Sequence, residues 1–161
     1  MALVTLIFKI IFILFFFLFP NFFKSQIVNG DAKVIDGDTI HIGKNKIRLH
    51  GIDAPEKNQK CVFNNKDWEC GKNSTLALRE MIENSPVICR IKDVDRYKRY
   101  IAVCFSGKKN LNKMMVKNGW AIAYRYYSKD YIDEEFIAKR KKLGIWRGTF
   151  EEPYIYRKNN K

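Results

Sequence analysis

The 161-residue chain lacks the features that mark zinc-binding and repeat proteins. It has only two histidines and four cysteines, and no cysteine pair has the C-x-x-C spacing of common zinc sites. It contains no internal repeat and no long linker, and its length corresponds to one domain with room for a hydrophobic core. We therefore expect a single folded domain without a zinc centre.

Acidic residues are also scarce, since 17 Asp and Glu stand against 30 Lys and Arg, and the formal net charge is +13. Such a surface attracts polyanions, of which nucleic acid is the most common. A solvated surface on a lysine-rich protein has the same composition. Charge alone therefore leaves both interpretations open.

Long apolar runs are confined to the N-terminal segment. Lys9 precedes an unbroken apolar run over residues 10–19, which Pro20 ends. The run has the length of the hydrophobic region of a signal peptide and is short for a membrane span. Because no A-x-A cleavage site stands near residues 21–26, segment 1–25 is predicted to be a signal peptide or an uncleaved anchor. The protein is expected to be secreted or periplasmic, and to meet a membrane only through this segment.

The four cysteines are predicted to form two disulfides. Segments 87–94 and 100–106 have strand patterns and are joined by the polar turn DRYKR. A hairpin centred between Arg96 and Tyr97 places Cys89 opposite Cys104, with Cα atoms about 4.5–5.5 Å apart, within disulfide range. This pairing leaves Cys61 with Cys70, and an exported chain favours both bonds. Buried free thiols at 89 and 104 are the alternative.

The order of predicted elements is three strands, a helix, two strands and two helices. Five strands with a helix between the third and fourth suit a small closed barrel of the OB type, which commonly binds oligonucleotides. The predicted fold class is therefore α+β, mainly β: a five-stranded OB-fold barrel with three helices. Residues 26–150 would form this domain, followed by a basic, polar C-terminal tail, 151–161, with a frayed end.

Two neighbouring stretches, VIDGDTIHI and KIRLHGIDAPE, gather four carboxylates around one arginine, Arg48: Asp36, Asp38, Asp53 and Glu56. Strand alternation turns Arg48 away from its apolar neighbours, and the chain then emerges into the last two carboxylates. Phosphodiester hydrolysis needs a base for water and positive charge at the phosphoryl oxygens, which Glu, Arg and an Asp-bound hard cation can supply. Each motif alone has a simpler explanation, since Asp-Gly is a common hairpin turn. Together they predict a metal and a general base beside phosphate-binding arginines.

Five separated motifs, VIDGDTI, IRLHGIDAPE, DRYKR, KNGWAIAYRYY and KKLGIWRG, resemble, in this order, the staphylococcal nuclease (thermonuclease) family. The resemblance covers roughly residues 32–147, which is nearly all of the mature chain. It implies the same barrel with three helices and a calcium-dependent nuclease acting on DNA and RNA with little sequence preference. Magnesium accepts the same ligands. No protein partner is implied, and a monomer is expected.

The resemblance also assigns roles to the metal ligands Asp38, Asp53 and Ala54 (through its backbone carbonyl), to the catalytic residues Arg48, Glu56 and Arg99, and to the substrate-binding tyrosines Tyr97, Tyr124 and Tyr126. Two positions depart from the family pattern. Ala54 replaces a threonine, which a main-chain ligand tolerates. Lys98 replaces the glycine of the DRYKR turn, which costs energy if the position needs a positive φ, and it can then shift Arg99.

Two other functions belong to different classes. One is an OB-fold module that binds nucleic acid without cutting it, and the other is a disulfide-stapled adhesion or envelope protein that does not respond to metal. A binding module has no need of Glu56 beside Arg48, so the enzyme is the favoured interpretation.

Overall fold

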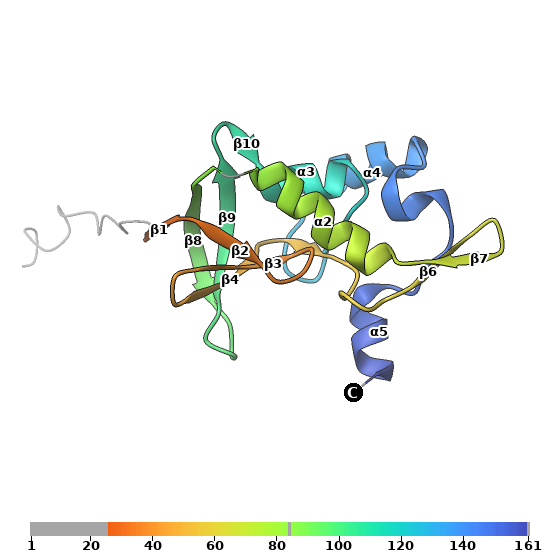
Figure 1. The fold of residues 1–161 in the computed structure, drawn as a ribbon, viewed down its shortest axis with the longest axis horizontal. Helices are drawn as coiled ribbons and strands as arrows, with labels where there is room; N and C mark the ends of the chain where they lie inside the picture. Colours follow the sequence, from red (N-terminus) through yellow and green to blue (C-terminus); the bar gives the residue numbers. More distant parts are fainter. Residues whose placement is uncertain (1–25, 84, 161) are drawn as a thin grey trace, which may run out of the picture.

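The computed structural model describes residues 26–83 and 85–160 (Figure 1). The predicted signal peptide or anchor, residues 1–25, lies outside these ranges. No helix within these ranges is both long enough and apolar enough to span a bilayer.

The main element is a strongly curved sheet of seven strands: β1 (Ile27–Gly30), β2 (Ala32–Val34), β3 (Thr39–Ile42), β4 (Asn45–Leu49), β8 (Val87–Val94), β9 (Tyr100–Ser106) and β10 (Lys109–Asn110). The order is β1-β8-β9-β4-β3-β2, and β10 pairs with β9. All pairs are antiparallel except β4 with β9. The two outer strands, β1 and β2, are separated in the chain only by Asp31, so the sheet forms a nearly closed barrel.

Two short ladders lie outside the main sheet. One pairs β5 (Ile52–Asp53) with β11 (Ile122–Ala123), and the other pairs β6 (Cys61–Phe63) with β7 (Lys66–Trp68). The helices are α2 (Cys70–Ile82), α3 (Leu111–Lys117), α4 (Ile132–Arg140) and α5 (Pro153–Asn159), with a 3-10 turn, η1 (Gly144–Arg147). The predicted mainly-β barrel class is confirmed, although the described residues contain four α-helices rather than three.

The β3–β4 hairpin shows how the sequence places its polar face. Ile40 on β3 and Ile47 and Leu49 on β4 are buried, and alternation turns Arg48 to the opposite side. A two-residue turn joins the strands, and its first residue, Gly43, has φ 56°, a conformation that favours glycine.

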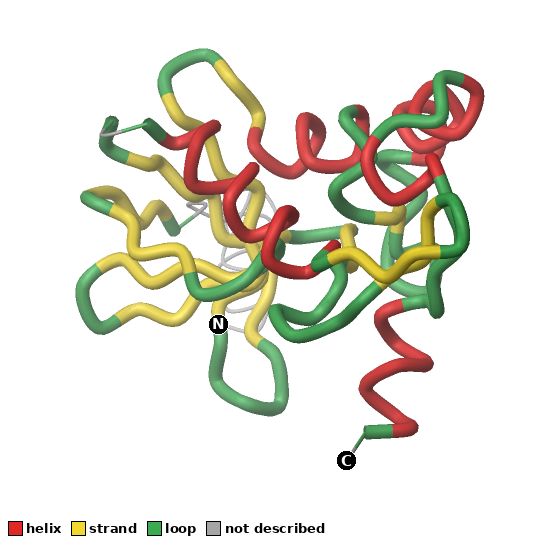
Figure 2. Tube along the Cα trace, turned by 45° about the vertical axis from the view of Figure 1, so that its right-hand side comes forward, coloured by secondary structure: helices red, strands yellow, loops and turns green. Residues whose placement is uncertain are grey.

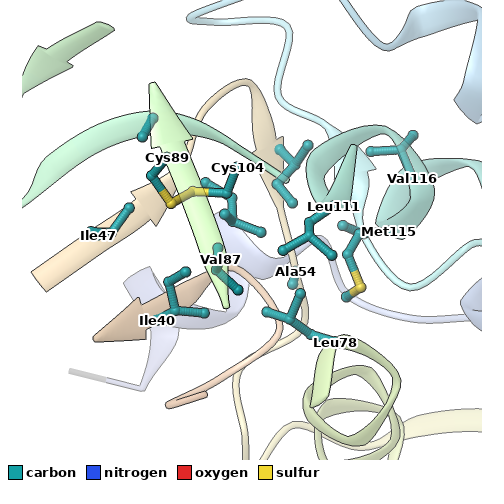
Figure 3. Close-up of a cluster of buried hydrophobic side chains, with 14 of the residues drawn as sticks. Ile40, Ile47, Ala54, Leu78, Val87, Cys89, Cys104, Leu111, Met115 and Val116 are labelled. Atoms are coloured by element: carbon teal, nitrogen blue, oxygen red, sulfur yellow. A yellow bond between two sulfur atoms is a disulfide. The ribbon is translucent and has the colours of Figure 1, made fainter. Parts of the chain in front are cut away.

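The main core lies between the sheet and helices α2 and α3 (Figure 3). Leu78 from α2 and Leu111 and Met115 from α3 are fully buried against it. Each such side chain contributes roughly 1.5–3 kcal/mol by leaving water. The Cys89–Cys104 disulfide lies inside this core, as Figure 3 shows.

The predicted register of the β8–β9 hairpin is confirmed at its cysteines, because Cys89 pairs with Cys104. The turn itself differs from the prediction. Val94 pairs with Tyr100, which centres the turn on Tyr97, and the register then shifts by one residue between Ile91 and Asp93. This bulge offsets the shift in the turn, so the cysteines still face each other.

A second, smaller core supports the C-terminal part of the chain. Its buried members are Cys61, Cys70, Ile122 and Ile145, with Trp68, Trp146 and Phe150 packed against them. The predicted Cys61–Cys70 disulfide is present at its centre. Val62 and Thr149 exchange two backbone hydrogen bonds of 2.8 and 2.9 Å beside it. These contacts bring the C-terminal segment next to β6.

The segment predicted to be a frayed polar tail contains helix α5. Pro153 occupies its first turn, where a missing N–H costs nothing. Figures 1 and 2 show α5 extending from the body of the molecule, beside the loop that follows β5.

Candidate active site

Asp38 lies in the turn between β2 and β3. The turn is shaped by Asp36, whose Oδ1 accepts a 3.0 Å hydrogen bond from the backbone N–H of Asp38. A side chain at Gly37 would collide with Ser74 of α2 and with Ala54, so glycine lets the turn press against both. The sequence thus fixes Asp38 against the loop that follows β5.

The Asp38 carboxylate is buried and fully hydrogen-bonded. Its Oδ1 accepts hydrogen bonds from the Thr39 hydroxyl at 2.9 Å and from Arg48 Nη1 at 3.0 Å. Its Oδ2 lies 2.9 Å from Arg48 Nη2 and accepts a 3.1 Å bond from the backbone N–H of Ala54. Four donors therefore hold this carboxylate in one orientation.

Arg48 bridges two carboxylates from separate segments. It stands on β4 opposite Thr39 of β3, and its Nη2 also donates to Asp53 Oδ1 at 2.6 Å. Burial would lower the pKa of Arg48, but Asp38 and then Asp53 raise it above its ordinary value. Only a planar guanidinium can reach both acids with several parallel hydrogen bonds.

Asp53 is fully buried at the end of β5, where it pairs with Ile122 of β11. Burial and the charge of Asp38 raise the pKa of Asp53, and hydrogen bonds from an arginine oppose them. Burial and then the charge of Asp38 also raise the pKa of Asp36, to about 7. The cluster therefore holds acidic groups close enough to repel one another.

Glu56 lies in the loop after β5 with its side chain about one-third exposed (34 %). Its backbone N–H donates to Gln59 Oε1 at 3.1 Å, and its carbonyl accepts from the Gln59 backbone at 2.7 Å. The first turn of α2 packs so closely on the Glu56 carbonyl that a side chain at Gly71 would collide with it. The backbone of Glu56 is thus fixed, while its carboxylate reaches toward solvent.

Arg157 on α5 also lies in this site, although it was not predicted as a site residue. Its Nη1 donates to Glu56 Oε1 at 2.8 Å and lies 2.9 Å from Asp53 Oδ1, while Nη2 donates to Asp53 Oδ2 at 3.0 Å. Pro153 after Glu152 could have indicated the start of the helix. Nothing local could have shown a contact between residues 101 positions apart.

Arg99, predicted to bind phosphate, is held instead by Asp95. Its Nε and Nη2 both lie 2.8 Å from Asp95 Oδ2, and its backbone N–H donates to Asp95 Oδ1 at 2.9 Å. Among the described residues, no hydrogen bond joins Arg99 to Asp38, Asp53 or Glu56. The neighbouring Lys98 has φ 61°, so the position does require the left-handed conformation that glycine would adopt without strain.

The predicted substrate-binding tyrosines lie on two loops. Tyr97 is exposed at the tip of the β8–β9 turn, with the guanidiniums of Arg96 and Arg99 4.8 and 5.6 Å from its ring centroid. Tyr124 and Tyr126 form a cluster after β11, with ring centroids 6.5 Å apart.

The second cluster also includes Tyr127, which was not predicted as a site residue. Its ring centroid lies 5.1 Å from that of Tyr124 and 4.9 Å from that of Tyr126. Tyr126 and Tyr127 are largely exposed. Burial and then the charge of Asp53 raise the pKa of Tyr124. The Tyr124 hydroxyl therefore interacts electrostatically with the carboxylate cluster. Tyr126 and Tyr127 thus expose aromatic rings beside Tyr124, with the planes of these two rings at 83° to each other.

The donor atoms of the cluster suit a hard divalent cation, because carboxylate and backbone oxygens are the ligands that calcium and magnesium prefer. Four carboxylates also outnumber the two guanidiniums of Arg48 and Arg157. Across residues 26–83 and 85–160, however, no three Asp, Glu, His or Cys side chains converge as a ready-made metal cage. The oxygens of Asp38 and Asp53 are occupied by arginine N–H groups instead.

Comparison with known proteins finds a nuclease family and relatives that are named nucleases. The family model described as staphylococcal nuclease homologue matches residues 46–148. An uncharacterized endonuclease of Haemophilus influenzae is 36% identical over 138 residues, covering 81% of this chain and 72% of the relative. A micrococcal nuclease of Shigella flexneri is 31% identical over 157 residues, covering 86% and 83%. The succinoglycan biosynthesis protein ExoI of Rhizobium meliloti is 37% identical over 131 residues, covering 79% and 69%. The matched family region contains Arg48 and Glu56 and ends before Arg157.

Proposed function

The chain belongs to the staphylococcal nuclease family, and on this premise we propose that it is an exported, metal-dependent nuclease that hydrolyses phosphodiester bonds in DNA and RNA. Relatives that are named endonuclease and micrococcal nuclease support the reaction class. Because the tyrosine surface can stack on any base, we expect little sequence preference.

One observation carries this proposal. The turn that bears Asp38, the strand that bears Arg48 and the loop that bears Asp53 meet within hydrogen-bonding distance, and Glu56 follows three residues later. A protein that only binds nucleic acid needs arginines, but it gains nothing from burying carboxylates beside them. A hydrolase needs both kinds of group in one place.

Glu56 is proposed as the general base. Its carboxylate is more accessible than those of Asp38 and Asp53, and it can take the proton from a water molecule as the water oxygen forms its bond to phosphorus. Arg48 is proposed to hold two phosphoryl oxygens through its planar fork and to offset the charge that develops on them. Arg99 would join it after leaving Asp95.

A calcium or magnesium ion held by Asp38, Asp53 and the backbone carbonyl of Ala54 would add positive charge at the phosphoryl oxygens. Asp38 and Asp53 are fixed by their own hydrogen bonds, so the chain orients both carboxylates in advance. Calcium is the cation that the family resemblance implies.

Tyr97, Tyr124 and Tyr126 are proposed to contact the nucleotide. The exposed rings of Tyr97 and Tyr126 can stack on bases, which is worth about 1–3 kcal/mol per base. The basic surface attracts the substrate over a longer range and makes binding dependent on salt.

The two disulfides indicate an oxidising compartment. With the apolar segment at residues 10–19, they support the proposal that the protein is secreted or periplasmic, by a cleaved signal peptide or an N-terminal anchor.

The proposed chemistry is tested by Glu56→Gln. The amide has the same shape but cannot take a proton, so turnover on single-stranded DNA should fall by roughly 10²–10⁴-fold. Folding and DNA affinity should stay close to those of the parent protein. Glu69→Gln, an exposed carboxylate just before α2, is the matched control. Cleavage by Glu56→Gln at the parent rate would show that another group is the base.

A further inference from the structure

We propose that Arg157 is an additional functional residue of this site: it occupies Asp53 and Glu56 in the metal-free protein, and a divalent cation has to displace it from Asp53. The inference deepens the proposed function and rests on Asp53 being a metal ligand. Arg157 lies outside the region that the family model matches. It is a positioning residue in this role, because it acts through two other side chains.

Arg157 hydrogen-bonds to both carboxylates that it is proposed to occupy. Both Asp53 oxygens accept from it, at 2.9 and 3.0 Å, and the same guanidinium reaches Glu56 at 2.8 Å. Burial tends to lower the pKa of Arg157, but hydrogen bonds and charge from Asp53, followed by Glu56, raise it well above its ordinary value. The guanidinium therefore supplies positive charge where a metal ion would otherwise supply it.

The position of Arg157 is built into the fold. Gln59 is fully buried, and its side chain links two backbones: Oε1 accepts from the Glu56 N–H at 3.1 Å, and Nε2 donates to the Glu151 carbonyl at 2.7 Å. Glu151 lies just before α5. The base of the helix is thus tied to the loop that carries Glu56, which directs Arg157 toward the carboxylates.

Metal binding and Arg157 docking compete for the same atoms. Asp53 Oδ1 accepts from both Arg48 and Arg157, whereas Oδ2 accepts from Arg157 alone. A cation that approaches Asp53 through Oδ2 therefore competes with Arg157, and the two positive groups repel each other. The Arg157 side chain is 30% exposed, so it can move into water without being buried elsewhere. Arg48 is only 15% exposed and bonded to two acids, so the cation is expected to displace Arg157 more readily than Arg48. Metal binding should therefore release α5.

The test is calorimetric titration of calcium into the oxidised protein, without nucleic acid, for the parent, Arg157→Gln and Lys158→Gln. Lys158 is an exposed neighbour on α5, so its replacement removes the same charge without touching Asp53. We expect Arg157→Gln to bind calcium more tightly on the order of tenfold, the effect of losing one partly exposed ion pair to each of two acids. Lys158→Gln should shift the dissociation constant less than twofold.

A second readout follows α5 directly. The backbone amides of α5 that follow Pro153 should exchange with solvent faster in calcium than in chelator for the parent protein, and at equal rates in Arg157→Gln. Equal calcium affinities for Arg157→Gln and Lys158→Gln, or slower exchange of α5 in calcium, would overturn the competition. Failure of all three proteins to bind calcium would refute the metal site itself, and with it the proposed metal dependence.

Discussion

The two halves of the candidate site are supported in different ways. The barrel half consists of Asp38 in the turn before β3, Arg48 on β4 and Asp53 on β5. It lies beside the main core, and its carboxylates are buried. The outer half, Glu56 and Arg157, is held by a loop and by helix α5, and both side chains are about one-third exposed. Each core contains one disulfide, Cys89–Cys104 in the main core and Cys61–Cys70 in the second core.

Because the two halves differ in burial, mutations in them should affect protein stability and catalysis differently. A buried acid that loses its arginine keeps an uncompensated charge, which costs several kcal/mol. An ion pair near the surface contributes little to folding, because water replaces the lost partner. Changes in the barrel half should therefore reduce both stability and activity, whereas changes in the outer half should alter activity and metal binding with little loss of stability.

The largest expected effect is that of Arg48→Lys. A lysine cannot bridge Asp38 and Asp53 or hold two phosphoryl oxygens, so nuclease turnover should fall by about 10²–10³-fold. The free energy of unfolding should also fall, by about 1–3 kcal/mol, since one buried acid loses its donor. Kinetics and urea unfolding of the same preparation measure both losses, and Arg90→Lys on the exposed face of β8 is the control. If Arg48→Lys lost activity but kept its stability, the barrel half would behave like the outer half, and the proposed difference between them would be wrong.

The two disulfides test whether the halves unfold separately. They close segments of 15 and 9 residues, so chain entropy predicts a loss of about 3 kcal/mol for Cys89→Ala/Cys104→Ala and slightly less for Cys61→Ala/Cys70→Ala. We expect hydrogen exchange to accelerate throughout the barrel in the first variant. In the second it should accelerate mainly in β6, β7 and α5. Uniform acceleration in the second variant would show that both cores form one cooperative unit.

Asp36 gives the barrel half a dependence on pH. Its pKa rises from the ordinary 3.8 to about 7 on folding, so between these values the folded state binds more protons than the unfolded state. The free energy of unfolding of the metal-free protein should therefore fall as pH rises through this window. Asp36→Asn removes this decrease.

At pH 8 we expect Asp36→Asn to be more stable than the parent by about 2 kcal/mol, since one pKa unit is worth about 1.4 kcal/mol and partial solvent access reduces the sum. Urea unfolding in chelator at pH 5 and pH 8 measures the difference, with Asp67→Asn on the exposed hairpin as the control. A stability difference between parent and variant that stays the same at both pH values would argue against this account.

The smallest expected effect lies on the tyrosine surface. Tyr126 is 83% exposed, so Tyr126→Ala should leave stability unchanged and weaken binding of single-stranded DNA by about five- to tenfold through lost stacking. Fluorescence anisotropy in chelator measures this without cleavage. Phe136→Ala removes an exposed aromatic residue on α4 outside the cluster, and an equal loss of affinity in that variant would remove the special role of Tyr126.

The barrel half could be predicted from the sequence because its signals are local. Alternation placed Arg48 opposite Ile47 and Leu49, and Asp53 follows five residues later, so one hairpin and one loop determine the cluster. The pairing of Cys89 with Cys104 was also predictable, because both lie in one hairpin.

The outer half could be predicted only in part, because Glu56 follows Asp53 in the same loop whereas Arg157 comes from a distant segment. Arg157 reaches Glu56 because the second core around Cys61 and Cys70 and the Val62–Thr149 pair position α5. No periodicity encodes a contact over that separation. The ion pair of Arg99 with Asp95 was missed for a different reason, since the choice between two nearby acids depends on side-chain geometry in the turn.

The most direct test of the central claim is the length of single-stranded DNA fragments over time, with the oxidised protein in calcium and in chelator. We expect progressive shortening in calcium and intact DNA in chelator, which would establish the carboxylate cluster as part of a metal-dependent nuclease. DNA that stays intact in both conditions while remaining bound to the protein would contradict it and indicate a non-catalytic binding module.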